Sequence, residues 1–198
     1  MALFGRKDPA AIPLKNEPYN TIALVLEDGD FSRWLDAMER LSALLEGPFN
    51  FGHEFRGGGL LSKGRAVQGP DALARIREKL DAKTDVLTLA RTDPSYGQQG
   101  YDWVCRFYQV LATVDRNGLG EGSWRSILSL PEPLWEALGR EPLLELASGG
   151  FQVVSGEIFR LPLGEGPLFC AVDPREDRAE FCQAYPGYAL LEELSPDA

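Results

Sequence analysis

The first residues that could carry chemistry form a glycine-rich loop between basic side chains. Arg56 and Lys63 flank the run Gly57-Gly58-Gly59. Backbone amides in such loops can bind phosphate, particularly where the loop leads into a helix. However, the Gly-Lys-Ser/Thr ending of a P-loop is missing, and so is the third glycine of a dinucleotide fingerprint. We therefore interpret the segment as a flexible surface loop that forms the most basic local patch of the chain.

The single histidine, His53, and the cysteines could supply a base and a nucleophile. One histidine cannot provide the two or three imidazoles of most catalytic zinc sites. Cys105, Cys170 and Cys182 are widely spaced, odd in number and outside any local sequence typical of a catalytic cysteine. We predict that all three are buried free thiols in a reducing, cytoplasmic compartment, and we predict neither a metal nor a cofactor.

Four carboxylates follow predicted strand ends, which is a common place for catalytic acids. Glu27, Asp28 and Asp30 lie in one turn, and Asp115 opens a later turn. Together they could serve a metal-dependent hydrolase, because sites built from oxygen ligands need no local motif. The spacing after Asp115 does not match a calcium loop, and Gly-x-Ser-x-Gly does not occur. Turn and capping roles already account for the first three residues, so we do not predict an enzyme.

The segment from residue 173 to the end of the chain is the most acidic part of the sequence and a candidate docking surface for a basic protein. Acidic runs are more often solvated faces of a helix, and that alternative stays open. Trp124 follows a glycine-rich turn without helical or strand periodicity, which predicts an exposed aromatic anchor. The acidic residues predicted to bind are Asp173, Glu176, Asp177, Glu180, Glu192 and Glu193.

Net charge limits the classes of partner. Thirty acidic residues against twenty basic ones give a net charge of −10 and a pI near 4.7. Phosphate backbones and anionic membranes attract basic surfaces, so direct binding to nucleic acid or to a membrane is disfavoured. No signal peptide and no apolar run long enough to span a membrane is recognisable. A basic protein is the partner that this charge favours.

The elements that would position these residues include one clear helix. Apolar residues recur at three- and four-residue steps over residues 31–45. Asp30 is suited to cap its start, and Gly47 followed by Pro48 is suited to end it. Residues 1–18 contain three prolines and are expected to form an extended tail.

The remaining pattern mixes strands and helices without a regular alternation. Residues 47–69 are predicted to be a loop, Ser129 to cap a helix, and Ser155-Gly156 to form a hairpin turn. Strands are predicted at 21–26, 85–91, 103–114, 151–154, 157–161, 168–172 and 188–191, and further helices at 70–80, after 130, at 143–147 and after 173. We predict an α+β fold with a mixed or antiparallel sheet and several amphipathic helices. Residues 19–194 would form a single compact domain, with 115–122 as the one candidate internal boundary.

Three functions are compatible with these residues. The first is a non-enzymatic protein that binds another, basic protein through an acidic surface, in its narrowest form an inhibitor or immunity protein against a basic toxin or nuclease. The second is the small carboxylate- or metal-dependent hydrolase. The third is a structural subunit of a larger assembly that docks through its N-terminal tail. The sequence does not indicate an oligomeric state.

Overall fold

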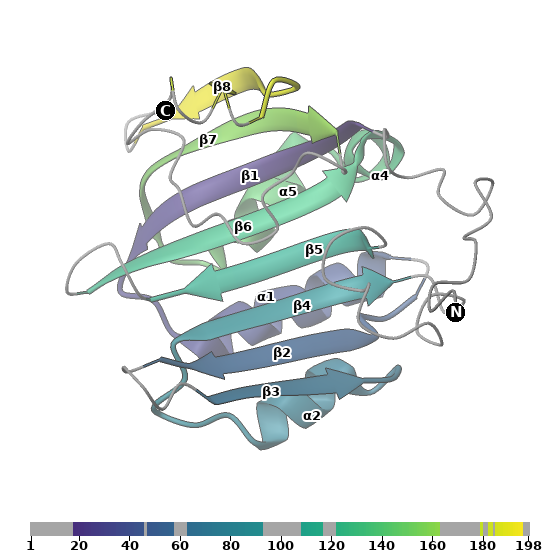
Figure 1. The fold of residues 1–198 in the computed structure, drawn as a ribbon, viewed down its shortest axis with the longest axis vertical. Coiled ribbons are helices and arrows are strands. Elements are labelled where there is room, and N and C mark those ends of the chain that lie inside the picture. The colour runs from purple at the N-terminus through teal and green to yellow at the C-terminus, as the bar shows by residue number, and fades with distance from the viewer. Residues whose placement is uncertain are drawn as a thin grey trace, which may run out of the picture.

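The computed structural model describes residues 18–45, 47–57, 63–92, 108–116, 122–162, 179, 182–183 and 185–195. Within these residues the chain forms one antiparallel sheet of eight strands in the order β3-β2-β4-β5-β6-β1-β7-β8 (Figure 1). The strands are β1 (Pro18–Glu27), β2 (Phe51–Arg56), β3 (Lys63–Gln68), β4 (Val86–Thr92), β5 (Tyr108–Asp115), β6 (Ser123–Pro131), β7 (Gln152–Pro162) and β8 (Ala189–Leu194).

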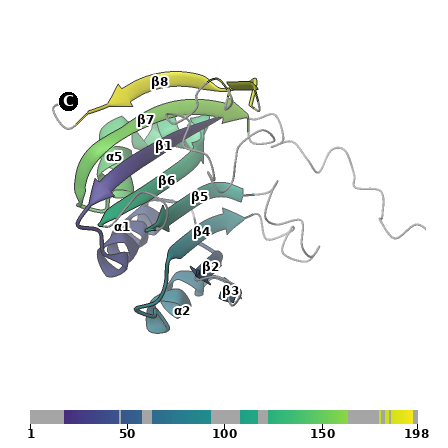
Figure 2. The ribbon, with the colours of Figure 1, turned by 60° about the vertical axis from the view of Figure 1, so that its left-hand side comes forward.

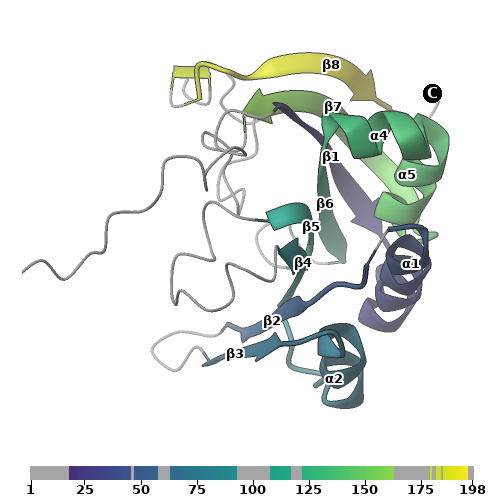
Figure 3. The same ribbon diagram turned by 90° about the vertical axis from the view of Figure 1, so that its right-hand side faces the viewer.

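In the described part of the chain, four helices lie on one face of this sheet, which curves across its width (Figures 2 and 3). They are α1 (Phe31–Leu44), α2 (Ala72–Glu78), α4 (Glu132–Leu138) and α5 (Arg140–Ser148). The α+β class and the antiparallel sheet are thereby confirmed. Amphipathicity is clear for α1, which buries one side, whereas α4 contains no buried residue.

The helix α1 forms where the sequence predicts it. The Asp30 carboxylate accepts hydrogen bonds from the backbone N–H groups of Ser32 and Arg33 at 2.5 and 3.4 Å, as an N-cap should. The helix ends earlier than predicted, with Leu45 as C-cap in an extended conformation, so Gly47 does not terminate it. Its buried residues, Phe31, Trp34, Leu35, Ala37, Met38 and Leu41, pack against the helix-covered face of the sheet.

The two faces of the sheet differ in chemistry because successive strand residues point to opposite sides. Alternate residues such as Ile22, Leu24 and Leu26 join the hydrophobic core under the helices. The opposite face carries buried hydroxyl groups, which pair across neighbouring strands. Thr21 Oγ1 lies 2.9 Å from Ser129 Oγ, and Thr88 Oγ1 lies 3.2 Å from Thr113 Oγ1. The sheet is therefore buried on both faces along its central strands.

The predicted loop over residues 47–69 is wrong, because it contains the antiparallel pair β2 and β3. Gly52 stands on the side where α2 packs, and a Cβ there would lie 2.7 Å from Ile76 Cγ1. The glycine is therefore explained by a close approach of α2 to the strand rather than by a flexible loop. The strand β2 was missed because glycine was interpreted as a loop residue.

The predicted hairpin turn at Ser155-Gly156 is also wrong. Both residues lie inside β7, a single strand of eleven residues that pairs with β1. A Cβ on Gly156 would lie 2.6 Å from the carbonyl oxygen of Ala23, so this glycine allows the two backbones to approach. The register between β1 and β7 also shifts between Val25 and Leu26, next to this position.

The helix predicted after residue 130 exists, but its predicted cap does not. Ser129 lies in β6, where its hydroxyl group is 2.9 Å from that of Thr21, and Pro131 occupies the N-cap position of α4. The predicted strand at 168–172 and the predicted start of a helix at 173 lie outside the described residues. The single domain over residues 19–194 stays a prediction. The strands on either side of the candidate internal boundary at 115–122 are β5 and β6, and they pair directly with each other.

Candidate functional site

The carboxylates proposed for a hydrolase come to one end of the sheet. Glu27 ends β1 beside Ser123, the first residue of β6, and Asp115 ends β5 opposite Arg125. Asp28 adopts a positive φ of 56°, which Asp tolerates in tight turns. Asp30 is engaged as the cap of α1. Within the described residues, no three His, Cys, Asp or Glu side chains gather in the way a metal site requires.

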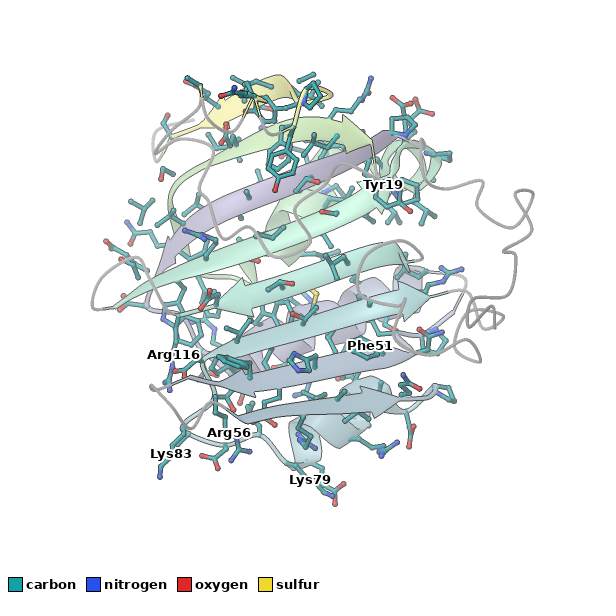
Figure 4. The ribbon with its side chains drawn as sticks, viewed as in Figure 1. Tyr19, Phe51, Arg56, Lys79, Lys83 and Arg116 are labelled. Carbon is teal, nitrogen blue, oxygen red and sulfur yellow. The ribbon has the colours of Figure 1, made fainter. Side chains whose placement is uncertain are left out.

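Of the basic residues predicted around the glycine loop, Arg56 lies at a corner where β2, β4 and β5 meet the loop before β4, beside Lys83 and Arg116, which were not part of the prediction. Figure 4 shows Arg56, Lys83 and Arg116 at this end of the sheet. Arg116 Nε donates to Asp85 Oδ1 at 3.0 Å, and Arg56 Nη1 donates to Asp81 Oδ2 at 2.5 Å. These ion pairs hold the loop against the strand ends, which is a structural role.

Gly57, the first glycine of the loop, already has a partner. Its backbone N–H donates to Asp85 Oδ2 at 2.5 Å, so a carboxylate of the chain occupies the position at which a phosphate would bind this amide. Gly58 and Gly59, with the side chain of Lys63, lie outside the described residues. The contacts that are described favour an internally neutralised corner over an anion site.

Behind this corner lies a buried carboxylate. The side chain of Glu54 is 0% exposed, and it forms ion pairs with Arg65 at 2.8 Å and with Arg56 at 3.1 Å. The hydroxyl group of Thr84 also donates to it. Burial raises the pKa of Glu54, but the hydrogen bonds from Thr84 and Arg65 and the charges of both arginines outweigh burial, so its pKa lies below the ordinary value.

His53 occupies the sheet face opposite the helices, because its neighbour Gly52 faces α2. Burial lowers the pKa of His53, and the nearby charge of Glu54 opposes that shift only in part. The cysteine predictions are tested at one position. Cys182 is a free, exposed thiol, so its predicted burial is wrong. Its described neighbour Gln183 is exposed as well, because this short segment lies outside the core. Cys105 and Cys170 lie outside the described residues.

Trp124 is placed at the margin of the core. Its ring meets Phe31 edge-on, with centroids 4.8 Å apart and an interplanar angle of 72°. A Cβ on Gly29 would lie 2.3 Å from the indole ring. The side chain is half-buried, so its packing explains the residue without a role as an exposed anchor.

An acidic surface lies on the other side of the molecule, over α4, α5 and β8. We define it by Glu136, Glu141, Glu145 and Glu192. Glu141 and Glu145 are 79% and 66% exposed, and no described ion pair involves Glu136. Of the predicted acidic binding residues, Glu192 belongs to this surface, whereas Glu193 stands opposite Glu157 of β7 on the other face of the sheet. Asp173, Glu176, Asp177 and Glu180 lie outside the described residues.

Arg140 joins the helical part of this surface to β8. It forms ion pairs with Glu141 and Glu192, and its Nε donates to Glu192 Oε2 at 2.8 Å. The hydrogen bond from Arg140 lowers the pKa of Glu192, and the two carboxylates raise the pKa of Arg140. Figure 3 shows α4, α5 and the end of β8 on the same side of the molecule.

A hollow of about 440 Å³ opens within the acidic surface, and we call it the α5 hollow. Three of its residues are apolar, and two carboxylates one helical turn apart stand on its rim. Ser126 of β6 helps to fix α5 in place, because its hydroxyl group donates to Ala147 O at 2.6 Å. The hollow is lined by Glu141, Pro142, Leu144, Glu145, Ser148 and Val153.

The residues of this hollow were not among those predicted from the sequence. The signal that could have identified them is the spacing of Glu141 and Glu145, which places two acids on one side of a short helix. Val153 lies near these two residues because β7 pairs with β1. A local sequence pattern cannot predict that pairing.

By geometry the chain is an α+β protein whose antiparallel sheet carries helices on one face. Comparison of the chain with protein-family models, with curated proteins and with solved structures gave no match. None of the helices among the described residues is long and apolar enough to cross a membrane. A proposal about function therefore depends on the surface of the chain itself.

Proposed function

We propose that this chain is a non-enzymatic protein that binds a basic protein through the acidic surface on α4, α5 and β8. In its narrowest form it is an inhibitor or immunity protein that neutralises a basic toxin or nuclease. One observation carries the proposal: the α5 hollow is lined by apolar residues together with exposed carboxylates. A basic partner could bury an apolar group there while its cations meet Glu141 and Glu145.

The two parts of this surface would contribute differently to binding. Complementary charge increases the association rate, from about 10⁵–10⁶ to about 10⁸–10⁹ M⁻¹s⁻¹ in the fastest complexes. The apolar lining residues Pro142, Leu144 and Val153 would slow dissociation, because buried contacts at the centre of an interface dominate affinity. The ion pairs of Glu141 with Arg140 and of Glu145 with Arg40 are solvent-exposed and therefore cheap to exchange for those of a partner.

The test is an affinity capture of the tagged chain from its native host at low and at high salt. We expect a single basic partner at low salt that elutes at high salt, because exposed charge pairs are screened. The variant Glu141→Gln/Glu145→Gln should weaken its binding by about tenfold or more. The matched control is Glu27→Gln/Glu78→Gln, which removes two exposed acids that have no described ion pair and lie outside the surface. This control should bind as the wild type does.

Equal loss of binding in both variants would mean that overall charge, not this surface, attracts the partner. An empty eluate at both salt concentrations would contradict the proposal and favour the carboxylate- or metal-dependent hydrolase. Thermal unfolding with divalent metals and nucleotides would then be the next measurement, because a ligand that binds the native state alone must raise its apparent stability.

A further inference from the structure

The two exposed carboxylates that line the α5 hollow are each paired with an arginine of the chain itself. Arg40 of α1 donates through Nη1 to Glu145 Oε1 at 3.0 Å, and Arg140 forms an ion pair with Glu141. The side chains of Arg40 and Glu145 are 56% and 66% exposed. Both carboxylates can therefore accept a guanidinium group, and the pair between Arg40 and Glu145 is open to solvent.

The two arginines are held to different degrees. Arg140 donates to both carboxylate oxygens of Glu192, through Nε at 2.8 Å and through Nη2, so Glu192 fixes its position. In the described part of the chain, Arg40 has one ion-pair partner, Glu145. An exposed pair of long side chains is screened by water and loses side-chain entropy, so it contributes little stability. Glu145 is therefore the carboxylate that a partner can most easily engage.

The lining of the hollow suits a side chain that is apolar along its length and cationic at its tip. Pro142, Leu144 and Val153 supply apolar surface, and Glu141 and Glu145 stand beside it, one helical turn apart. Arginine and lysine cover apolar surface with their stems while the charged end contacts water or a carboxylate. The composition of the hollow therefore matches one of these two side chains.

The arrangement of the two carboxylates favours arginine over lysine. Residues four apart on a helix have Cβ atoms about 5–6 Å apart. A guanidinium group has five N–H donors in a planar fork and can donate to two carboxylates at once, whereas an ammonium group is a compact and strongly hydrated charge. Arg140 provides an example on the same surface, because it donates to both Glu141 and Glu192.

We infer that the α5 hollow receives an arginine side chain of the basic partner, and that Arg40 competes with this side chain for Glu145. The inference rests on the proposed function and identifies the residue type that anchors the partner. The stem of that arginine would cover Leu144 and Val153, and its guanidinium group would bridge Glu141 and Glu145. Arg40 is not among the lining residues, so it competes for the charge of Glu145 and not for space in the hollow.

The test uses the full chain with isotope-labelled leucine and valine methyl groups, followed by NMR, and it needs no identified partner. The probe is N-acetyl-arginine amide. The matched compound is N-acetyl-citrulline amide, in which a neutral urea group replaces the guanidinium group. We expect the arginine compound to shift the methyl signals of Leu144 and Val153 saturably, and the citrulline compound to leave them in place. N-acetyl-lysine amide should bind more weakly than the arginine compound.

Two protein variants test the competition. Arg40→Gln frees Glu145, whereas Arg77→Gln removes the same charge from α2, where Arg77 pairs with Asp36 and Glu39 of α1. We expect Arg40→Gln to tighten binding of the arginine compound by about two- to fivefold, which corresponds to the loss of one exposed ion pair. Arg77→Gln should leave the affinity unchanged. A purely structural role for Arg40 would not increase the affinity, and circular dichroism would show that both variants are folded.

Two results would overturn the inference. They are equal shifts caused by the arginine and citrulline compounds, and equal affinity of the arginine compound for Arg40→Gln and Arg77→Gln. Neither would contradict the proposed function if affinity capture still yields a basic partner that Glu141→Gln/Glu145→Gln binds weakly. Conversely, an empty capture with normal binding of the arginine compound would contradict the proposed function and leave the preference of the hollow for arginine intact.

Discussion

At the scale of single residues, Glu54 is the least expected side chain in the described structure. It is fully buried next to α2, and two arginines and one hydroxyl group satisfy its oxygens. A buried carboxylate is expensive to desolvate, and removal of either charge from such a pair leaves an uncompensated charge behind. The network also fixes the ends of β2 and β3 relative to the loop that contains Thr84, so it couples folding of this corner to ionisation.

We expect Glu54→Gln to lower the free energy of unfolding by about 3 kcal/mol at pH 7, because both arginines lose their buried counter-charge. The matched control is Glu78→Gln on the exposed side of α2, which should change it by less than about 0.5 kcal/mol. The measurement is urea denaturation of the three proteins, with the slope of the transition used to confirm comparable unfolding.

The same variant has a distinct dependence on pH. The folded pKa of Glu54 is lowered, so its contribution to stability is present above the unfolded carboxyl pKa of about 4.3 and is lost as the pH falls through the folded value. The difference between wild type and Glu54→Gln should therefore be largest at neutral pH and shrink below about pH 4. A difference that stays constant down to pH 3 would mean that packing, not charge, explains the effect.

At the scale of elements, Gly156 decides whether β7 is one strand or two. Its backbone passes so close to β1 that a Cβ would lie 2.6 Å from Ala23 O and 2.7 Å from Leu24 Cδ2. Neither neighbour can move easily, because one is backbone and the other is a core side chain that is 0% exposed. The glycine therefore permits continuous pairing between β1 and β7.

We expect Gly156→Ala to destabilise the protein by about 2 kcal/mol or more, since the new methyl group overpacks the junction of β1 and β7. Gly47→Ala is the control, because its Cβ would have no neighbour closer than 3.8 Å and its φ is not positive. That substitution should be neutral or stabilising by up to about 1 kcal/mol. Thermal unfolding followed by circular dichroism would separate the two, and equal melting temperatures would contradict the close approach.

Sequence patterns predict an element correctly when the residues that stabilise it lie within that element. The helix α1 was predictable because its apolar period and the cap at Asp30 both lie within its own sequence. The strands β2 and β6 were missed because their signal depends on distant neighbours. Gly52 and Ser129 look like loop and cap residues until α2 and β1 are placed beside them. Tertiary contact overrides local propensity at these positions.

The same distinction applies to the candidate site. Glu192 was predictable as part of an acidic segment, because charge is a property of composition. Glu141 and Glu145 are candidate binding residues because they line a hollow together with Val153. Val153 reaches α5 because β7 pairs with β1. The shape of the surface could not be read from the spacing of its acids.

At the scale of the whole molecule, the order of the strands separates opposite charges. Residues 51–92 contain eight basic and five acidic residues, whereas the described residues between 122 and 195 contain three and seven. The first segment forms the β3-β2-β4 side of the sheet, and the second contributes β6, β7 and β8. Charge is therefore unevenly distributed among the described residues, and under the proposed function a basic protein would be oriented toward the side of β6, β7 and β8 before contact.

The resistance of the protein to proteases should depend on which strands of the sheet are present. A fragment of residues 1–150 keeps β6 but lacks β7, which pairs with the whole length of β1. We expect this fragment to be digested rapidly under conditions in which the full chain survives, because β1 loses one of its two partners. A fragment that lacks only residues 186–198 removes an edge strand and should stay resistant. Equal resistance of both fragments would contradict a central role for β1.

The position of β1 in the sheet also affects how the chain can fold while the ribosome is still synthesising it. The first strand of the described structure lies between β6 and β7, so it leaves the exit tunnel long before either partner has been made. At typical elongation rates of about 5–20 residues per second, β1 waits on the order of ten seconds with its apolar residues unpaired. The β2, β3 and β4 strands can pair during that interval, whereas β1 gains its second partner only after β7 has emerged.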